Sequence, residues 1–259
     1  MEHTLYITNL QDLEYFTESY SRIYFGTEFC QNLIPHQKEL ELVLKFVENH
    51  SISFSLVTPY VTDKGLQKLI PLFSYISDKI GSSEVIFNDW GVFNVIKHQF
   101  PQLKPVLGRL LTKIKRDPRI IYLREKISSN TWNYFRTTNL NIPWYREFLK
   151  NNGIERIDLD NPLQGINLNF PDFHKSLYFP YGHITTTRLC LTANCDQPED
   201  WDRIGIFPCH RECQHYTFYL QNNVMPVKLI RKGNTIFYQN EKILSDQHDR
   251  LVYQPKIPI

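Results

Sequence analysis

Apolar and polar residues follow two patterns along this chain, one typical of buried strands and the other of amphipathic helices. The first pattern predicts strands over 4–9, 21–30, 51–61, 83–89, 104–111, 154–162 and 176–190. The second predicts helices over 10–20, 37–50, 63–76, 90–100 and 143–153, and Pro71 should kink or shorten the third of these. Residues 227–244 read as a hairpin turned at Gly233 and Asn234. Strands and helices therefore take turns over most of the chain.

This alternation predicts a parallel sheet, because parallel neighbours are reconnected by crossover helices. We expect an α/β protein with a (β/α) TIM-barrel-like fold, complete or incomplete, with a cysteine-rich segment and a C-terminal hairpin. One domain should span residues 1–259, with the cysteine segment at 188–213. An open doubly wound sheet is the alternative, although no glycine-rich phosphate loop follows the first strand.

In a barrel the residues that end the strands converge on one face, where active sites are built. That face should therefore carry polar and thiol side chains from distant parts of the chain. The residues at the predicted strand ends are Cys30, Pro59, Tyr60, Asn88, Asp89, Arg109, Asp160, Asn161 and Cys190.

Bulk composition excludes several classes of protein. The 259 residues are 42% hydrophobic and 14% aromatic, which is typical of a packed globular protein. The net charge of +2 is spread along the chain, so binding to nucleic acid or to an anionic membrane is not required by charge, and the basic stretch "KIKRDPR" is read as a solvated loop. The N-terminus lacks the order of a secretory signal, and no segment is apolar for long enough to span a bilayer. We expect a cytoplasmic protein.

Four of the five cysteines lie within "RLCLTANCDQPEDWDRIGIFPCHREC", residues 188–213. In a reducing cytosol such crowding favours metal binding or redox chemistry over structural disulfides. The spacing does not match the short pairs of zinc ribbons, whereas iron-sulfur clusters tolerate irregular spacing and can take a distant ligand such as Cys30. Free buried cysteines are the alternative without a metal.

Three polar residues on predicted strand ends are candidates for a catalytic role. Arg109 stands among apolar residues in "VLGRLL" and needs either a ligand or a buried partner. At a barrel mouth it suits a carboxylate or phosphate substrate, and the alternative is an ion pair with Asp89 or Asp160. Asn88 and Asp89 belong either to the site or to the cap of the next helix.

Arg188, two residues before Cys190, is a candidate for stabilising the negative charge of a thiolate-bound cofactor, or else an ordinary exposed residue. His183 and His210 are interpreted as ordinary polar residues rather than ligands.

Several segments resemble the collagenase-like peptidase family U-32, in particular its subgroup of the ubiquinone-biosynthesis proteins UbiU and UbiV. The resemblance is carried by "EVIFNDWGVFNVIKHQFPQLKPVLGRLLTKIKRDPR" (84–119), "SRIYFGTEFC" (21–30), "TTTRLCLTANC" (185–195) and "CHREC" (209–213). It covers most of the chain to about residue 240, but the alanine-rich opening of the family is absent.

This resemblance implies a 4Fe-4S cluster and a part in oxygen-independent hydroxylation of a small molecule, with a UbiU-like protein as a partner. It implies that Cys30, Cys190, Cys209 and Cys213 are the ligands and that Cys195 is spare. The separation of Cys190 from Cys209 is longer than expected for a UbiV-like protein, which leaves open a set in which Cys195 replaces Cys190.

Two other functions remain alternatives. The family name implies a peptidase, but the sequence has no nucleophile elbow and no H-E-x-x-H zinc helix. A metal-stabilised scaffold that binds a partner, with a blocked barrel mouth and no catalysis of its own, is the other alternative.

Overall fold

The computed structural model describes residues 1–197, 199, 206–243 and 247–259. Residues 198 and 200–205 of the predicted cysteine segment, and residue 244 of the predicted hairpin, lie outside the described residues. No helix in the described part of the chain is long and apolar enough to cross a membrane.

Eight parallel strands close into a barrel in the order β1-β12-β7-β6-β5-β4-β3-β2. The predicted barrel is therefore confirmed and complete, and the open doubly wound sheet is wrong. The strands are β1 (Glu2–Ile7), β2 (Arg22–Gly26), β3 (Ser53–Val57), β4 (Glu84–Phe87), β5 (Lys104–Leu107), β6 (Arg156–Leu159), β7 (His174–Phe179) and β12 (Arg250–Tyr253).

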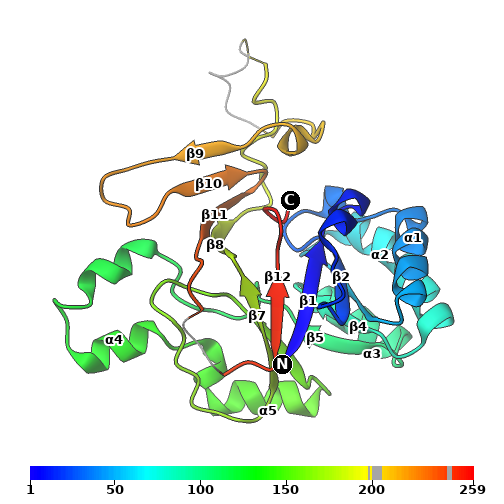
Figure 1. The fold of residues 1–259 in the computed structure, drawn as a ribbon, viewed down its shortest axis with the longest axis horizontal. Coiled ribbons are helices and arrows are strands. Elements are labelled where there is room, and N and C mark those ends of the chain that lie inside the picture. The colour runs from blue at the N-terminus through cyan, green and yellow to red at the C-terminus, as the bar shows by residue number, and fades with distance from the viewer. Residues whose placement is uncertain (198, 200–205, 244–246) are drawn as a thin grey trace.

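Amphipathic helices form the outer layer, since each has an apolar stripe to bury against the strands. They are α1 (Gln37–Asn49), α2 (Asp63–Ile80), α3 (Trp90–Gln99) and α5 (Pro143–Asn151). The short α4 (Ser129–Phe135) belongs to the long β5–β6 connection, which projects to one side of the barrel (Figure 1). Short 3-10 helices complete the connections: η1 (Leu10–Tyr15), η2 (Gln31–Leu33), η3 (Pro118–Leu123), η4 (Asn139–Asn141) and η6 (Glu212–Gln214).

A second, antiparallel sheet is inserted between β7 and β12 and lies over the C-terminal ends of the barrel strands (Figure 1). Its strands, in the order β8-β11-β10-β9, are β8 (Tyr181–Thr186), β9 (Phe218–Leu220), β10 (Leu229–Lys232) and β11 (Thr235–Gln239). The predicted hairpin is confirmed as β10 and β11, joined by Gly233 with φ +59° and Asn234. The sheet is held to the barrel rim by an apolar cluster of Phe29, Cys213, Ile230, Phe237 and Ile259.

Three sequence-based expectations about elements were wrong. The apolar run 176–190 forms β7 in the barrel and β8 in the small sheet instead of one strand, and the break falls at Pro180, which has no N–H for a strand ladder. Residues 10–20 form only the short 3-10 helix η1, which begins with a capping box between Asn9 and Asp12. Of the two effects expected of Pro71, shortening is wrong, because α2 continues to Ile80 and Pro71 lies on its exposed side, where water can hydrate the carbonyl left free; a kink stays a prediction.

Candidate metal centre

A cavity at the junction of the barrel rim and the small sheet is the candidate site. Its walls come from the segments after β2 and β3, from the two ends of the cysteine segment, from the β10–β11 turn and from Ile259. The cavity has a volume of about 70 Å³, several times the space that one water molecule needs. The side chains around it therefore line an open cavity and are not packed against one another.

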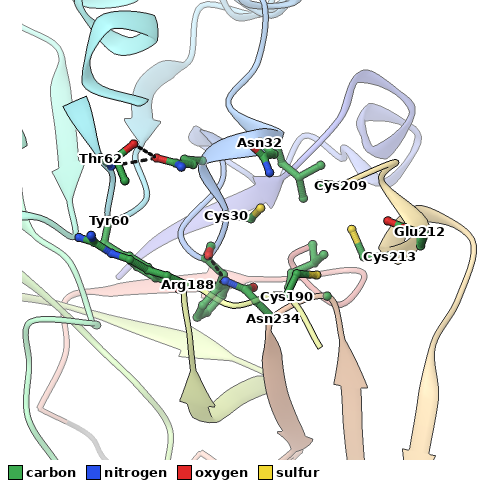
Figure 2. A pocket seen from close by; sticks show the side chains of 15 residues that line it. Cys30, Asn32, Tyr60, Thr62, Arg188, Cys190, Cys209, Glu212, Cys213 and Asn234 are labelled. Carbon is green, nitrogen blue, oxygen red and sulfur yellow. Dashed lines mark hydrogen bonds between the residues drawn. The ribbon is translucent and has the colours of Figure 1, made fainter. Parts of the chain in front are cut away.

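Four cysteines line this cavity: Cys30, Cys190, Cys209 and Cys213. Figure 2 shows them around the same space, with Tyr60, Thr62 and Arg188 to one side and Glu212 to the other. They are the four thiols that the resemblance described above implies as ligands, and their role as ligands stays a prediction. Cys195 is half-buried but does not belong to the cavity lining, so the structure places Cys190 rather than Cys195 beside the other three.

The electrostatics of the thiols reflect their proximity. Burial, together with smaller contributions from the neighbouring thiols of Cys213, Cys209 and Cys190, raises the pKa of the Cys30 thiol to about 11. Burial also raises the pKa of Cys213, again with Cys190 and Cys209 adding to the rise. Negative charge on this group of sulfurs is costly unless a cation neutralises it, because each thiolate would repel the others in a partly buried site.

In the described residues, no three His, Cys, Asp or Glu side chains form a group that could hold a single metal ion. A single zinc ion needs its sulfurs at about 2.3 Å from one centre. A 4Fe-4S cluster is larger than an ion and takes thiolates that stand farther apart. Four thiols around one partly shielded cavity are the kind of donor set that such a cluster takes, and a bound cluster stays a prediction.

One wall of the cavity, beside Arg188 and Cys190, is fixed by Asn234. Its side-chain Nδ2 lies 2.6 Å from the carbonyl of Phe29, 2.6 Å from the carbonyl of Thr187 and 2.9 Å from the hydroxyl of Tyr60. Asn234 is almost fully buried. One amide group therefore joins the β10–β11 turn to the segments that carry Cys30 and Cys190.

Arg188 lines the cavity and packs against the ring of Tyr60, which lines it too. Its guanidinium lies over the Tyr60 ring at 5.8 Å and donates to the carbonyl of Val61. Among the described residues it has no carboxylate within ion-pair distance. A cation without an acidic partner at this wall suits a cofactor or a substrate that carries negative charge, and the role of Arg188 stays a prediction.

Arg109 is fully buried below the small sheet and does not line the cavity. Its guanidinium contacts Glu28 at 2.7 Å and Asp160 at 3.0 Å and donates to the carbonyl of Tyr181 at 2.8 Å. Although burial opposes the charged form, the two carboxylates hold the pKa of Arg109 above its usual value. Arg109 therefore forms the buried ion pair that sequence analysis gave as the alternative, and its partner is Asp160 and not Asp89. A contact between Arg109 and a substrate stays a prediction.

Asn88 and Asp89 both satisfy backbone groups. Asp89 accepts from the backbone N–H of Gly91 at 2.7 Å, as the N-cap of α3, and from that of Val61 at 3.2 Å. Asn88 is buried, donates to the carbonyl of Thr58 and accepts from the N–H of Leu110. These bonds give both residues the capping and loop-holding role that the sequence allowed, while a catalytic role remains untested.

Sequence analysis did not single out Glu28, Gln31 or Asn234 as parts of this region. Glu28 is a fully buried acid in the apolar run "FGTEFC", which is a signal that could have pointed to a buried cation. Gln31 accepts from the N–H and hydroxyl of Thr62 at the start of α2, and nothing local in the sequence indicates that contact. His183 is buried near Asp160, and His210 is exposed.

No protein-family model and no curated protein sequence matches this chain. Among solved structures, "The Structure of the U32 Peptidase Mk0906" aligns with 100% of this chain and 94% of that chain, at 12% identity and a TM-score of 0.49. A plant class V chitinase mutant from Cycas revoluta in complex with (GlcNAc)3 aligns with 98% of this chain and 94% of that chain, at 6% identity and a TM-score of 0.36. Both likenesses are too distant to carry a conclusion about function.

Proposed function

We propose that this chain holds a 4Fe-4S cluster on Cys30, Cys190, Cys209 and Cys213. We further propose that it takes part in oxygen-independent hydroxylation of a small molecule, alone or as a subunit beside a UbiU-like partner. The observation that carries the cluster is the convergence of these four thiols on one cavity. The hydroxylation and the partner rest on the sequence resemblance to the U-32 family and its UbiU and UbiV subgroup.

Two features support a cluster rather than inert thiols. Cys30 follows β2 and the other three cysteines lie in the connection between β8 and β9 of the small sheet, so the fold itself brings them together. Burial and mutual repulsion make the thiolates of Cys30 and Cys213 unfavourable without a cation. A cluster supplies that cation and can exchange one electron at a time with a substrate or a partner.

The protein's own groups would position the reactants. Asn234 holds the segments that carry Cys30 and Cys190 close together, because it donates to the carbonyls of Phe29 and Thr187. Arg188, on the Tyr60 ring, offers positive charge at the end of the cavity away from Glu212. A small anionic substrate would be drawn to that end.

The test is anaerobic purification of the full chain, followed by measurement of iron, acid-labile sulfide and the visible absorption spectrum. We expect about four irons and four sulfides per chain. The single variants C30A, C190A and C213A should each lose most of this iron, because each removes a thiolate that holds the cluster.

The matched control is C195A, which removes a cysteine of the same segment that does not line the cavity. It should keep the full iron content. Stoichiometric zinc without sulfide, or iron loss in C195A equal to that in C190A, would contradict the proposed ligand set.

A metal-stabilised scaffold is the second candidate, because the barrel mouth is filled. Arg109, Glu28 and Asp160 are all fully or almost fully buried there, and the small sheet lies above them. If the cluster only holds the small sheet in place, its reduction should be irreversible or should unfold the sheet. Reversible one-electron reduction with unchanged circular dichroism would favour the catalytic function instead.

A further inference from the structure

We propose that a second cavity, next to the cysteine cavity, is a binding site for a free α-amino acid. In this site Arg211 binds the carboxylate of the amino acid and Glu39 binds its ammonium group. None of the described residues that line the second cavity is a cysteine, so the inference does not depend on the proposed cluster.

The second cavity lies at the carboxyl ends of the first two barrel strands. Thr8 directly follows β1, Thr27 directly follows β2, and both line it. Ligand sites of (β/α) barrels are built at this end of the strands. The cavity has a volume of about 90 Å³, and at about 15 Å³ for each water-sized group it has room for roughly six such groups. That is the size of an amino acid with a short side chain. Leu33 and Ile259 line both cavities, so a ligand bound here lies beside the cysteine cavity.

The lining carries one positive and one negative side chain. Arg211 is exposed and donates to the carbonyl of Asn32 at 3.2 Å, and its other N–H groups have no partner among the described residues. Glu39 is half-buried, and one of its oxygens accepts from the backbone N–H of His36 at 2.7 Å in the capping box of α1. In the part of the chain that the structure describes, Arg211 and Glu39 form no ion pair with each other or with a third residue. Both charges are therefore available to a ligand.

Two unpaired charges of opposite sign select the class of ligand. A simple anion would be attracted by Arg211 but repelled by Glu39, and a simple cation would meet the reverse. A free α-amino acid carries a carboxylate and an ammonium group at neutral pH, so it satisfies both. The guanidinium offers the carboxylate two parallel hydrogen bonds, and the ammonium group donates to the remaining oxygen of Glu39.

The hydroxyl of Thr27 indicates that the bound amino acid is polar. Thr27 is 1% exposed, and its hydroxyl has no hydrogen-bond partner among the described residues. Buried hydroxyls nearly always have a partner, so this wall suits a ligand that brings a hydrogen-bonding group of its own. L-serine combines such a group with both charges and is therefore the probe.

Calorimetric titration of the full chain with L-serine tests the site. Glycerate, in which a hydroxyl replaces the ammonium group, and ethanolamine, which lacks the carboxylate, are the matched probes. We expect L-serine to bind with a dissociation constant several-fold below those of both. Glycerate or ethanolamine binding as tightly as L-serine would overturn the inference, and so would failure of L-serine, L-threonine and L-asparagine to bind.

Two variants assign the two charges. E39Q removes the negative charge but keeps an oxygen for the capping box, so it should lose the preference for L-serine over glycerate. R211A removes the guanidinium and should lose the preference for L-serine over ethanolamine. A loosened fold would weaken all three probes together and would leave these preferences in place. Circular dichroism of each variant checks that it is folded.

R124A is the control, because it removes an exposed arginine on the β5–β6 connection, which does not line the second cavity. It should bind L-serine like the wild type. L-serine preferences that are unchanged in E39Q and R211A, or lost in R124A as well, would contradict the assignment. These titrations need no iron, so a chain without iron and sulfide would overturn the proposed function and leave this inference standing.

Discussion

Two buried ionisable residues, Arg109 and Asp158, show that the surroundings of a side chain decide whether it carries a charge. Arg109 is fully buried but has two carboxylates and a carbonyl around its guanidinium, so its charge is retained. Asp158 is also fully buried, but it is bound by the hydroxyl of Tyr178 and lacks an ion-pair partner among the described residues. Burial raises the pKa of Asp158 to about 7. The neutral acid is therefore favoured in the folded protein below neutral pH.

This shift predicts a pH dependence of stability. The folded protein holds the Asp158 proton more tightly than the unfolded chain does, so this group's contribution is complete below the ordinary aspartate range and is lost as pH rises toward about 7. In D158N the amide stays neutral at every pH. The free energy of unfolding of D158N minus that of the wild type should therefore rise between pH 4 and pH 7, by up to ~4 kcal/mol, and then level off.

Chemical denaturation at a series of pH values measures this difference. D117N is the control, because Asp117 is exposed and pairs with Arg119 at the surface. If the difference between D158N and the wild type does not change with pH, Asp158 is ionised in the folded protein across this range.

At the scale of elements, the small sheet is docked on the barrel by an apolar cluster and by several hydrogen bonds, of which those of Asn234 come from the β10–β11 turn. Asn234 carries two N–H donors and reaches three acceptors on the barrel side and on β8. In the sheet itself β10 and β11 pair in register from Leu229 opposite Tyr238 to Lys232 opposite Thr235. The sheet can therefore keep its own pairing while its attachment to the rim is weakened.

N234A tests that separation. Removal of the amide leaves the buried carbonyl of Phe29 without this donor, whereas the carbonyl of Thr187 keeps the hydroxyl of Tyr60, and the loss should cost about 1–3 kcal/mol. Hydrogen exchange should become faster in β10, β11 and the segment around Cys30, with the rest of the barrel unchanged. N222A is the matched control, since Asn222 accepts only within its exposed turn. Uniformly faster exchange over the whole barrel would mean that the sheet does not dock as a separate element.

At the scale of the whole molecule, the barrel is closed by residues from both ends of the chain. β12 lies between β1 and β7 and pairs with both in parallel. Val252, at the middle of β12, is fully buried among the interior residues Tyr6, Tyr24 and Tyr178. Closure removes every free strand edge from the barrel.

V252P should therefore prevent closure, because proline lacks the N–H that the ladder needs and breaks the strand at its centre. We expect loss of cooperative thermal unfolding and a tendency to aggregate, measured by circular dichroism and light scattering. K256A changes an exposed side chain just after β12 that pairs with Asp12 and Glu14, so it should unfold cooperatively with at most a small loss of stability. A soluble and cooperative V252P protein would show that β12 is dispensable for the barrel.

The sequence could predict much of this fold because the periodicity of the first seven barrel strands and of four helices is local. Residues 37–50 illustrate it: the stripe of Leu40, Val43, Leu44 and Val47 is buried as expected. β12 could not be predicted in the same way. Its four residues include Arg250, whose charge is satisfied only by Glu2 and Glu84 from distant strands.

By itself the sequence determined the barrel class, the helical faces and the hairpin turn, because these depend on periodicity and on turn residues, whereas the set of cysteine ligands stays a prediction. The tertiary structure decided that β7 and β8 separate into two sheets, that Arg109 is bound by Glu28 and Asp160, and that Cys190 lines the cavity while Cys195 does not. These outcomes depend on contacts between residues far apart in the chain. Such contacts form only when barrel closure brings the strand ends to one rim.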